Sequence, residues 1–314
     1  SKLPISGAIT SPLLYLTGKT KKPIISLHYE AGNILAKEGK KVVQVVTDPH
    51  VRPQYLDIMP SKNLKFCVFD QKTKEDFLKI AKELDKDVKS EQVVVTGPPV
   101  DPRIIDARRI KDEWDGQRPL RIGITTGGLG TNKAEINKLL DKLSEAILAK
   151  KLPEIQFILY AGTHEDFREM YFEFAKKTNL EVSNIENGSA KLRVIYSESL
   201  VDANELLIEY LFPFADCIIT KPSGDMAYEG AASGASLLFL KPWGEWEENI
   251  RERFINLGVG RNFVVKDPIG ELAKLFDVGK SGKSWFEDSQ EKALNLPRLF
   301  LDGPKKIIEA AGKF

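Results

Sequence analysis

Short runs of apolar residues alternate with helical patterns along most of this 314-residue chain. A strand that is buried on both faces needs apolar residues throughout, so this alternation is typical of parallel β-sheets covered by helices. The sequence therefore predicts an α/β protein with two sets of strands. The first set covers residues 24–27, 42–46, 64–68 and 93–95, and the second covers 120–125, 155–160, 192–196, 217–220, 236–240 and 263–265.

A proline-rich segment separates the two sets. Residues 97–102 are Gly-Pro-Pro-Val-Asp-Pro, and a charged stretch follows that ends before Pro119. Proline is excluded from the interior of helices and central strands, so two domains are expected to join here. The sequence thus predicts an N-terminal domain over 1–100, a linker over 101–118 and a C-terminal domain over 119–314.

The two predicted domains differ in completeness. The second contains the units of a doubly wound, Rossmann-like sheet. The first lacks, before its strand at 24–27, the opening strand and glycine-rich turn with which such a domain commonly begins. We therefore expect two Rossmann-like domains of which the N-terminal one is truncated, with the last helix of the chain packing back on it.

The clearest helix follows Gly130. Asn132 is a suitable N-cap and Glu135 stands where a capping box requires an acidic residue. An apolar face at helical spacing follows, made of Ile136, Leu139, Leu140, Leu143 and Ile147.

Charge and cysteine content narrow the class of protein. The 46 Lys+Arg residues balance 45 Asp+Glu, which indicates no preference for nucleic acid. Cys67 and Cys217 lie in apolar strands and have no metal-ligand spacing, as expected of core thiols in a reducing compartment. No apolar run approaches the roughly 20 residues that span a bilayer, and no signal-peptide pattern is present. We expect a cytoplasmic protein without a bound metal.

One local basic run suggests contact with a membrane surface. Lys19, Lys21 and Lys22 follow Gly18 within a few residues. Such a run attracts anionic lipid, and the alternative is a solvated loop. The first reading makes the protein peripheral to a membrane.

The segment 219–230, Ile-Thr-Lys-Pro-Ser-Gly-Asp-Met-Ala-Tyr-Glu-Gly, has the composition of an anion site. An apolar strand ends there and a helix begins, and the first N–H groups of a helix attract phosphate. Glu229, about one turn into the helix, is placed to accept hydrogen bonds from sugar hydroxyls. The alternative is an ordinary strand-to-helix connection.

Two further turns follow strands of the same sheet. Gly127, Gly128 and Gly130 allow close approach of a ligand to the backbone, although the pattern is neither a Walker loop nor a clean G-x-G-x-x-G. Gly162 and His164 end the next strand, and carboxyl ends of parallel strands share one crevice. The alternatives are a tight turn and a surface histidine without a role.

A loop with two tryptophans follows the strand at 236–240. Trp243 and Trp246 stand among Glu245, Glu247 and Asn249. Exposed tryptophan is uncommon in a plain connection, so a loop that faces a ligand is predicted.

The first half offers a separate group for proton transfer. Asp48 and His50 follow the strand at 42–46, and His28 follows the strand at 24–27. A carboxylate beside an imidazole is able to take a proton. The alternative is a turn, because Asp-Pro commonly starts one.

Taken together, these segments resemble the GT-B glycosyltransferases that include monogalactosyldiacylglycerol synthase, processive diacylglycerol glucosyltransferases and the peptidoglycan lipid II N-acetylglucosaminyltransferase. The resemblance covers residues 24 to about 260. Its most specific part is residues 219–234, which look like the family's I-T-K-P-G-G…E…G segment, followed by Gly244 and Asn249 of its G-Q-E-x-x-N loop. Supporting matches lie at 25–28, 46–48, 96–100, 127–130 and 161–162.

The resemblance implies a UDP-sugar held by the C-terminal domain and an acceptor held by the N-terminal one, with no cofactor. By position it implies four groups of residues. Diphosphate contacts come from Ser223, Gly224, Asp225, Met226, Gly127, Gly128 and Gly130, the ribose contact from Glu229, contacts near uracil from Gly162 and Ser199, and contacts with the sugar from Glu245 and Asn249. Asp48 matches the family's acceptor-activating aspartate. His50 follows it by two residues, and His28 is expected on the same rim, at the end of the strand at 24–27.

Several residues depart from the family pattern. Ser223 replaces a glycine, Met226 replaces a small residue and Trp246 replaces a glutamate. Asp225 adds a carboxylate near the expected diphosphate, where like charges about 4 Å apart repel by roughly 1–4 kcal/mol.

The predicted activity is inverting, metal-independent transfer of a hexose from a UDP-sugar to the hydroxyl of an unidentified acceptor, with lipid, saccharide and small-molecule acceptors all open. The alternatives are a nucleotide-sugar epimerase or hydrolase of the same fold, and a non-catalytic subunit that binds a nucleotide or a partner.

Overall fold

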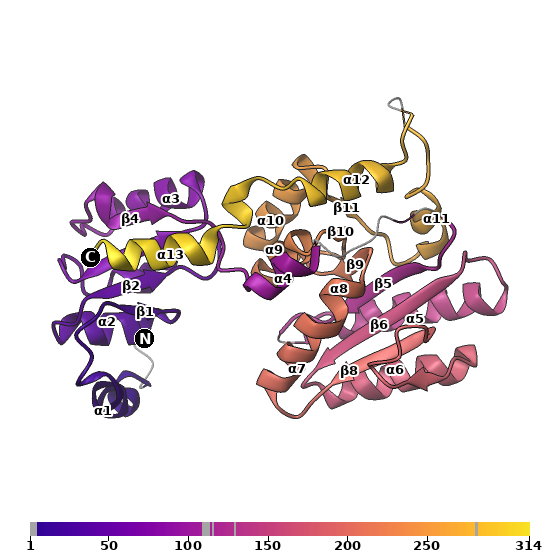
Figure 1. Ribbon diagram of the computed structural model, residues 1–314, viewed down its shortest axis with the longest axis horizontal. Helices are drawn as coiled ribbons and strands as arrows, with labels where there is room; N and C mark the ends of the chain where they lie inside the picture. The colour runs from indigo at the N-terminus through magenta and orange to yellow at the C-terminus, as the bar shows by residue number, and fades with distance from the viewer. Residues whose placement is uncertain (1–4, 109–113, 115, 129, 280–281) are drawn as a thin grey trace. The chain divides into compact units, whose positions relative to one another are not determined.

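The computed structural model describes residues 5–108, 114, 116–128, 130–279 and 282–314. The chain forms two compact units, the first made of Ser1–Asp101 with Pro297–Phe314 and the second of Pro102–Leu296. Each unit contains one parallel sheet with helices (Figure 1). The predicted α/β class with two Rossmann-like sheets is confirmed.

The first unit has a four-stranded parallel sheet in the order β1-β2-β3-β4. Its strands are β1 (Ile24–Ser26), β2 (Val42–Val45), β3 (Leu64–Val68) and β4 (Val93–Val95). Its helices are α1 (Ile5–Thr17), α2 (Tyr29–Lys37), α3 (Gln71–Glu83) and α13 (Gly303–Gly312), with short turns at η1 (Pro53–Leu56), η2 (Ser90–Gln92) and η5 (Arg298–Phe300).

The two faces of this sheet are covered from opposite ends of the chain. Val42 points toward a core that contains residues of α2 and α3, whereas Val43 and Val45 pack against Ile307 and Ala310 of α13. Figure 1 shows α13, in yellow, beside β2. Successive strand residues face opposite sides, so a run of valines supplies both cores.

The second unit has a seven-stranded parallel sheet in the order β11-β10-β9-β5-β6-β8-β7. Its strands are β5 (Leu120–Thr125), β6 (Ile155–Gly162), β7 (Val182–Ser183), β8 (Leu192–Tyr196), β9 (Cys217–Thr220), β10 (Ser236–Phe239) and β11 (Gly260–Asn262). Its helices are α4 (Pro102–Ala107), α5 (Lys133–Leu148), α6 (Glu165–Thr178), α7 (Leu200–Leu206), α8 (Phe212–Phe214), α9 (Gly224–Ala232), α10 (Glu245–Asn256), α11 (Pro268–Ala273) and α12 (Trp285–Leu294), and a π-helical turn, η4 (Leu207–Leu211), joins α7 to α8.

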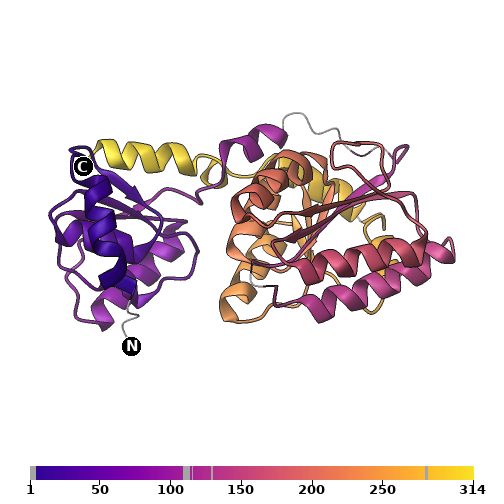
Figure 2. The same ribbon diagram turned by 90° about the horizontal axis from the view of Figure 1, so that it is seen from below.

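The order of the strands reverses between β5 and β9. From β5 the chain proceeds outward through β6 and β8, then returns to place β9 on the other side of β5. Such a reversal opens a crevice at the carboxyl ends of the two strands. Helices α5 and α6 lie side by side over one face (Figures 1 and 2), and Ile136, Leu139 and Leu143 of the predicted apolar face are buried there.

An ion pair joins the amino ends of the same two strands. Arg118 donates from both terminal nitrogens to the carboxylate of Asp216, at 2.7 and 2.8 Å, and the N–H of Arg121 donates to one of the same oxygens at 2.9 Å. Asp216 is fully buried. Because Arg118 and Asp216 precede β5 and β9, this contact lies at the end of the sheet opposite to the crevice.

Three expectations about secondary structure need correction. The last strand lies at 260–262 rather than 263–265, because these three residues pair in parallel with residues 237–239 of β10. A Cβ added at Gly260 would lie only 2.6 Å from the ring of Phe239. The expected linker begins with helix α4, since proline is tolerated in a first helical turn. Strand β7, with two residues, was not predicted.

Within the part of the chain that the structure describes, no helix combines the length and the apolar character needed to cross a bilayer.

The contact between α13 and the loop after β4 gives a prediction with a control in the same helix. A Cβ at Gly303 would lie 1.8 Å from the carbonyl oxygen of Pro98, whereas one at Gly312 of the same helix would have no neighbour within 4 Å. We expect Gly303→Ala to lower the free energy of unfolding by about 1–3 kcal/mol through overpacking. Gly312→Ala should leave it unchanged or slightly raised, because alanine favours helix. Urea unfolding of both variants measures this, and equal effects would contradict it.

Candidate functional site

The carboxyl ends of β5 and β9 are joined by a side-chain hydrogen bond across the strand reversal. The Nζ of Lys221, directly after β9, donates to the Oγ1 of Thr131, in the turn after β5, at 3.1 Å. The turn at 126–132 and the turn at 221–223 therefore face the same crevice. These are the two glycine-containing segments that the sequence singled out.

Lys221 also forms a buried ion pair. Its Nζ lies 2.9 Å from Oε1 of Glu247 in α10, and the two side chains are only 6% and 5% exposed. The other oxygen of Glu247 accepts the backbone N–H of Trp243 at 2.6 Å. The ammonium lies 5.3 Å from the centre of the Trp243 ring. This network connects the loops that follow β5, β9 and β10, which are neighbours in the sheet.

Glu135 does not complete the predicted capping box. Asn132 forms no side-chain capping bond in α5, and Oε1 of Glu135 instead accepts the N–H of Lys241 at 3.1 Å. The carboxylate thus supports the start of the loop that carries both tryptophans. Partial burial raises the pKa of Glu135, while the bond from Lys241 and the charges of Lys221 and Lys241 oppose that rise.

The glycine turn after β5 is shaped by a histidine. Gly130 has φ +61°, and its N–H donates to the carbonyl of Gly127 at 2.8 Å. A Cβ at Gly130 would lie 3.1 Å from the ring of His164, whose Nε2 is 3.2 Å from the carbonyl oxygen of Gly128. Because a carbonyl only accepts, this bond requires the proton on Nε2. His164, for which the sequence offered no partner, holds this turn.

Helix α9 begins at the expected anion site, with one correction. The first intrahelical bond runs from the N–H of Ala227 to the carbonyl of Ser223, so the N–H groups of Gly224 and Met226 precede the ladder. The N–H of Ser223 already donates to the carbonyl of Lys221 at 2.8 Å, which removes it from the predicted phosphate contacts. Asp225 is exposed and Met226 is buried.

Glu229 lies one turn further, and its charge acts on a tyrosine of β6. Tyr160, near the end of β6, is nine-tenths buried, and its pKa is raised first by burial and then by the negative charge of Glu229. Glu229 itself is partly exposed. The negative charge of Glu229 therefore reaches the carboxyl end of β6.

The remaining predicted donor residues lie at the same edge of the sheet. Gly162 ends β6 with φ +62°, and its carbonyl accepts the N–H of Ser197 at 3.1 Å. Ser199 caps α7 by accepting the N–H of Asp202 at 3.2 Å. Glu245 and Asn249 are exposed residues at the start of α10, on either side of the buried Glu247.

The predicted proton-transfer residues occupy neighbouring strand ends of the first unit. The Nδ1 of His28 accepts the N–H of Glu30 at 3.2 Å and so caps α2. One carboxylate oxygen of Asp48 accepts the N–H of His50 at 3.0 Å, as in an ordinary Asx turn. The Asx turn of Asp48 is the alternative that the sequence left open, whereas the cap formed by His28 was not anticipated. The catalytic roles of these residues stay predictions.

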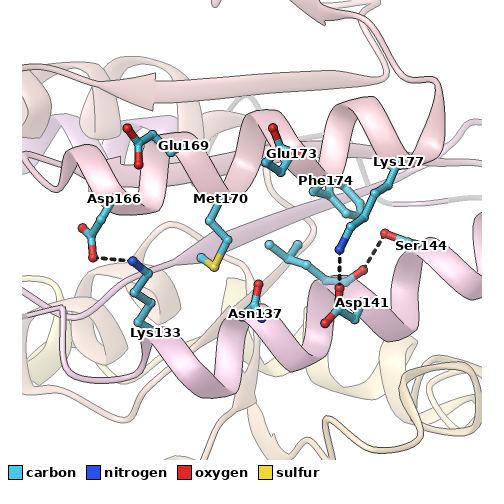
Figure 3. A pocket seen from close by; sticks show the side chains of 11 residues that line it. Lys133, Asn137, Asp141, Ser144, Asp166, Glu169, Met170, Glu173, Phe174 and Lys177 are labelled. Carbon is cyan, nitrogen blue, oxygen red and sulfur yellow. Dashed lines mark hydrogen bonds and ion pairs between the residues drawn. The ribbon is translucent and has the colours of Figure 1, made fainter.

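A groove between α5 and α6 contains none of the predicted site residues. Its volume is about 430 Å³, and ion pairs from Lys133 to Asp166 at 2.7 Å and from Lys177 to Asp141 at 2.8 Å cross it (Figure 3). Both lysines are thus already bound to carboxylates, and we place the candidate site at the strand reversal instead.

Sequence reasoning missed the residues that hold the site together. Lys221 received no role of its own, and Glu247 and His164 were placed at the crevice without partners. The motif at 219–230 contains Lys221, but nothing local indicates its partner, because Thr131 is 90 residues away.

Comparison with known proteins supports the architecture. No family model matches the sequence, and no curated protein matches it significantly. Among solved structures, UDP-GlcNAc 2-epimerase from Neisseria meningitidis bound to UDP-GlcNAc superposes with a TM-score of 0.61 at 15% identity, covering 99% of this chain and 81% of that one. Os79 from O. sativa in complex with UDP superposes with a TM-score of 0.60 at 12% identity, covering 98% of this chain and 81% of that one. MurG from Acinetobacter baumannii superposes with a TM-score of 0.51 at 16% identity, covering 99% of this chain and 78% of that one.

The two Rossmann-like units, the strand reversal with its glycine turn and helix terminus, and these likenesses define a protein of GT-B fold. The fold predicted from the resemblance of the motifs is therefore confirmed.

The partial burial of Glu135 predicts a pH-dependent stability difference. A raised pKa in the folded protein favours the protonated carboxyl, so this group's contribution is fully present below the pKa of the unfolded chain and is lost as pH rises through the folded value. Glutamine preserves an acceptor for the N–H of Lys241 but carries no charge. We expect the free energy of unfolding of Glu135→Gln, relative to the parent protein, to increase as pH rises through the acidic range and then level off. Urea titrations at several pH values measure it, and a difference that decreases with pH would contradict the assignment.

Proposed function

We propose that this chain is a UDP-glycosyltransferase that moves a hexose from a UDP-sugar to an acceptor hydroxyl, with inversion and without a metal ion. The observation that carries this proposal is the meeting of the turn at 126–132 with the N-terminus of α9 across the strand reversal. A helix N-terminus and a glycine turn together favour a diphosphate. The structures of similar fold that contain UDP or UDP-GlcNAc support the same ligand class.

The donor is assigned to the crevice of the second unit. The N–H groups of Gly224, Asp225 and Met226 bind the diphosphate, with Gly127, Gly128 and Gly130 lining its other side. The carboxylate of Glu229 accepts hydrogen bonds from the ribose hydroxyls, and Gly162 and Ser199 border the base. Glu245 and Asn249 contact the hexose.

In the proposed reaction, the acceptor oxygen attacks the anomeric carbon from the face opposite to UDP. The new C–O bond forms as the bond between the sugar and the diphosphate breaks, and UDP leaves with both electrons of that bond. Backbone N–H groups and the dipole of α9 stabilise the charge that develops on UDP. Asp48, or a histidine at the same sheet edge, His28 or His50, takes the proton of the acceptor.

A second candidate is a nucleotide-sugar epimerase or hydrolase. The likeness to the Neisseria epimerase, at a TM-score of 0.61, favours it specifically. A third candidate is a passive nucleotide-binding subunit. It is favoured by the exposed carboxylate of Asp225, which would repel a diphosphate at the proposed position.

Calorimetric titration with UDP tests the ligand class. The parent protein should bind UDP, and Glu229→Ala should weaken binding by roughly tenfold or more, because a hydrogen bond to a charged group contributes about 1.5–3 kcal/mol. Glu173→Ala, on the exposed surface of α6, serves as control and should bind as the parent does. Absence of binding at millimolar UDP would exclude both enzymatic functions.

Assays of UDP release with a panel of UDP-sugars then separate the reactions. A transferase releases UDP only when acceptor is added, and a hydrolase releases UDP without an acceptor. An epimerase converts the donor sugar without net release of UDP. A passive subunit neither converts the donor nor releases UDP.

We also propose that α1 and the loop after it contact an anionic membrane surface. Tyr15 and Leu16 are 87% and 77% exposed, and Lys19, Lys21 and Lys22 are exposed immediately after them. Aromatic and aliphatic side chains beside lysines match the interface of an anionic bilayer.

Sedimentation with lipid vesicles measures this contact. Binding should increase when phosphatidylglycerol is added to phosphatidylcholine and should decrease with salt. The double substitution Tyr15→Ser with Leu16→Ser should reduce it severalfold. Leu200→Ser with Val201→Ser removes a similarly exposed apolar pair beside acidic residues and should have no effect. Equal losses in both double variants would refute the assignment.

A further inference from the structure

We infer that Lys221 is a positioning residue, which fixes the phosphate-facing turn and the sugar-facing loop to each other and does not itself contact the donor. The inference rests on the proposed function for its ligand, and on the contacts of Lys221 for its geometry.

The ammonium of Lys221 is already enclosed by protein. Its Nζ bonds to Thr131 at 3.1 Å and pairs with Glu247 at 2.9 Å, and the ring of Trp243 lies beside it. The carbon stem passes beneath the glycine turn, since a Cβ at Gly127 would lie 3.7 Å from its Cδ. The side chain fills the space between three loops.

Burial argues against a move of this ammonium toward a ligand. Glu247 is 5% exposed, and a buried carboxylate that loses its cation carries a large desolvation penalty. A phosphate that attracted the ammonium outward would leave Glu247 uncompensated. The favourable state keeps Lys221 on Glu247 and leaves the phosphate to backbone N–H groups.

The position of Glu247 extends this effect to the hexose. Glu247 lies in α10 between Glu245 and Asn249, the residues assigned to the sugar, and it also accepts the N–H of Trp243. One ion pair therefore sets the spacing between the start of α10 and the turn at 126–132. Loss of the pair should disturb phosphate and sugar contacts together, although neither partner touches the donor.

Backbone hydrogen exchange in the ligand-free protein tests the positioning directly. The N–H of Gly130, which donates to the carbonyl of Gly127, should exchange at least tenfold faster in Lys221→Met than in the parent. Asp216→Asn weakens the ion pair between Arg118 and the buried Asp216, at the amino ends of β5 and β9, and should leave exchange at Gly130 unchanged.

The double variant Lys221→Met with Glu247→Gln separates positioning from charge compensation. It removes both charges, so thermal stability lost in Lys221→Met should largely return, while glutamine still accepts the N–H of Trp243. The bond to Thr131 is still absent, so UDP affinity should stay about tenfold or more below that of the parent, and Gly130 should still exchange fast. Recovery of the parent affinity and exchange rate in the double variant would overturn the inference.

The exchange readout keeps this inference distinct from the proposed function. If the parent protein fails to bind UDP while Gly130 responds to Lys221→Met as expected, the function is wrong and the positioning role stands. If UDP binds normally and exchange at Gly130 is the same in all variants, the positioning role is wrong.

Discussion

The ion pair between Lys221 and Glu247 is the constraint on which the candidate site depends. A parallel sheet fixes the strands through backbone hydrogen bonds, but the loops beyond their carboxyl ends have no such ladder. Here the loops after β5, β9 and β10 are held by one buried ammonium with its partners, and Glu135 adds a second link through the N–H of Lys241. Because an unpaired buried charge is strongly unfavourable, this arrangement has few alternatives.

The location of that pair follows from topology. The chain places β9 beside β5 only after it has built β6 and β8 on the other side, so two loops distant in sequence meet at the reversal. A helix terminus with its N–H groups and a turn with Gly130 in a left-handed conformation meet there. Backbone N–H groups at the start of α9 and in the glycine turn thus lie at one crevice. Such groups attract negative charge, which is the physical basis for assigning an anionic ligand.

Much of the fold follows from local pattern. Buried apolar runs predicted nine of the strands close to their observed positions, and the apolar face of α5 predicted its burial. The strand at Gly260–Asn262 was not predicted at its observed position, because it consists of a glycine and two polar residues rather than an apolar run. The ring of Phe239 packs against Gly260, where a side chain would collide with it. The capping box at Asn132 and Glu135 fits the local pattern, yet Glu135 bonds to Lys241 instead, because tertiary contact offered its carboxylate a different N–H donor.

The sequence by itself determined the elements that carry the site: two sets of apolar strands, and glycines and a helix start directly after them. These features depend on residues that are neighbours in the chain, and periodicity reveals them. Only the tertiary structure decided which side chains hold those elements in place. Lys221 and Thr131 are 90 residues apart, and His164 reaches the glycine turn from the next strand end. No local pattern encodes such pairings, because they arise from the order of strands in the sheet and from the need of each buried charge for a partner.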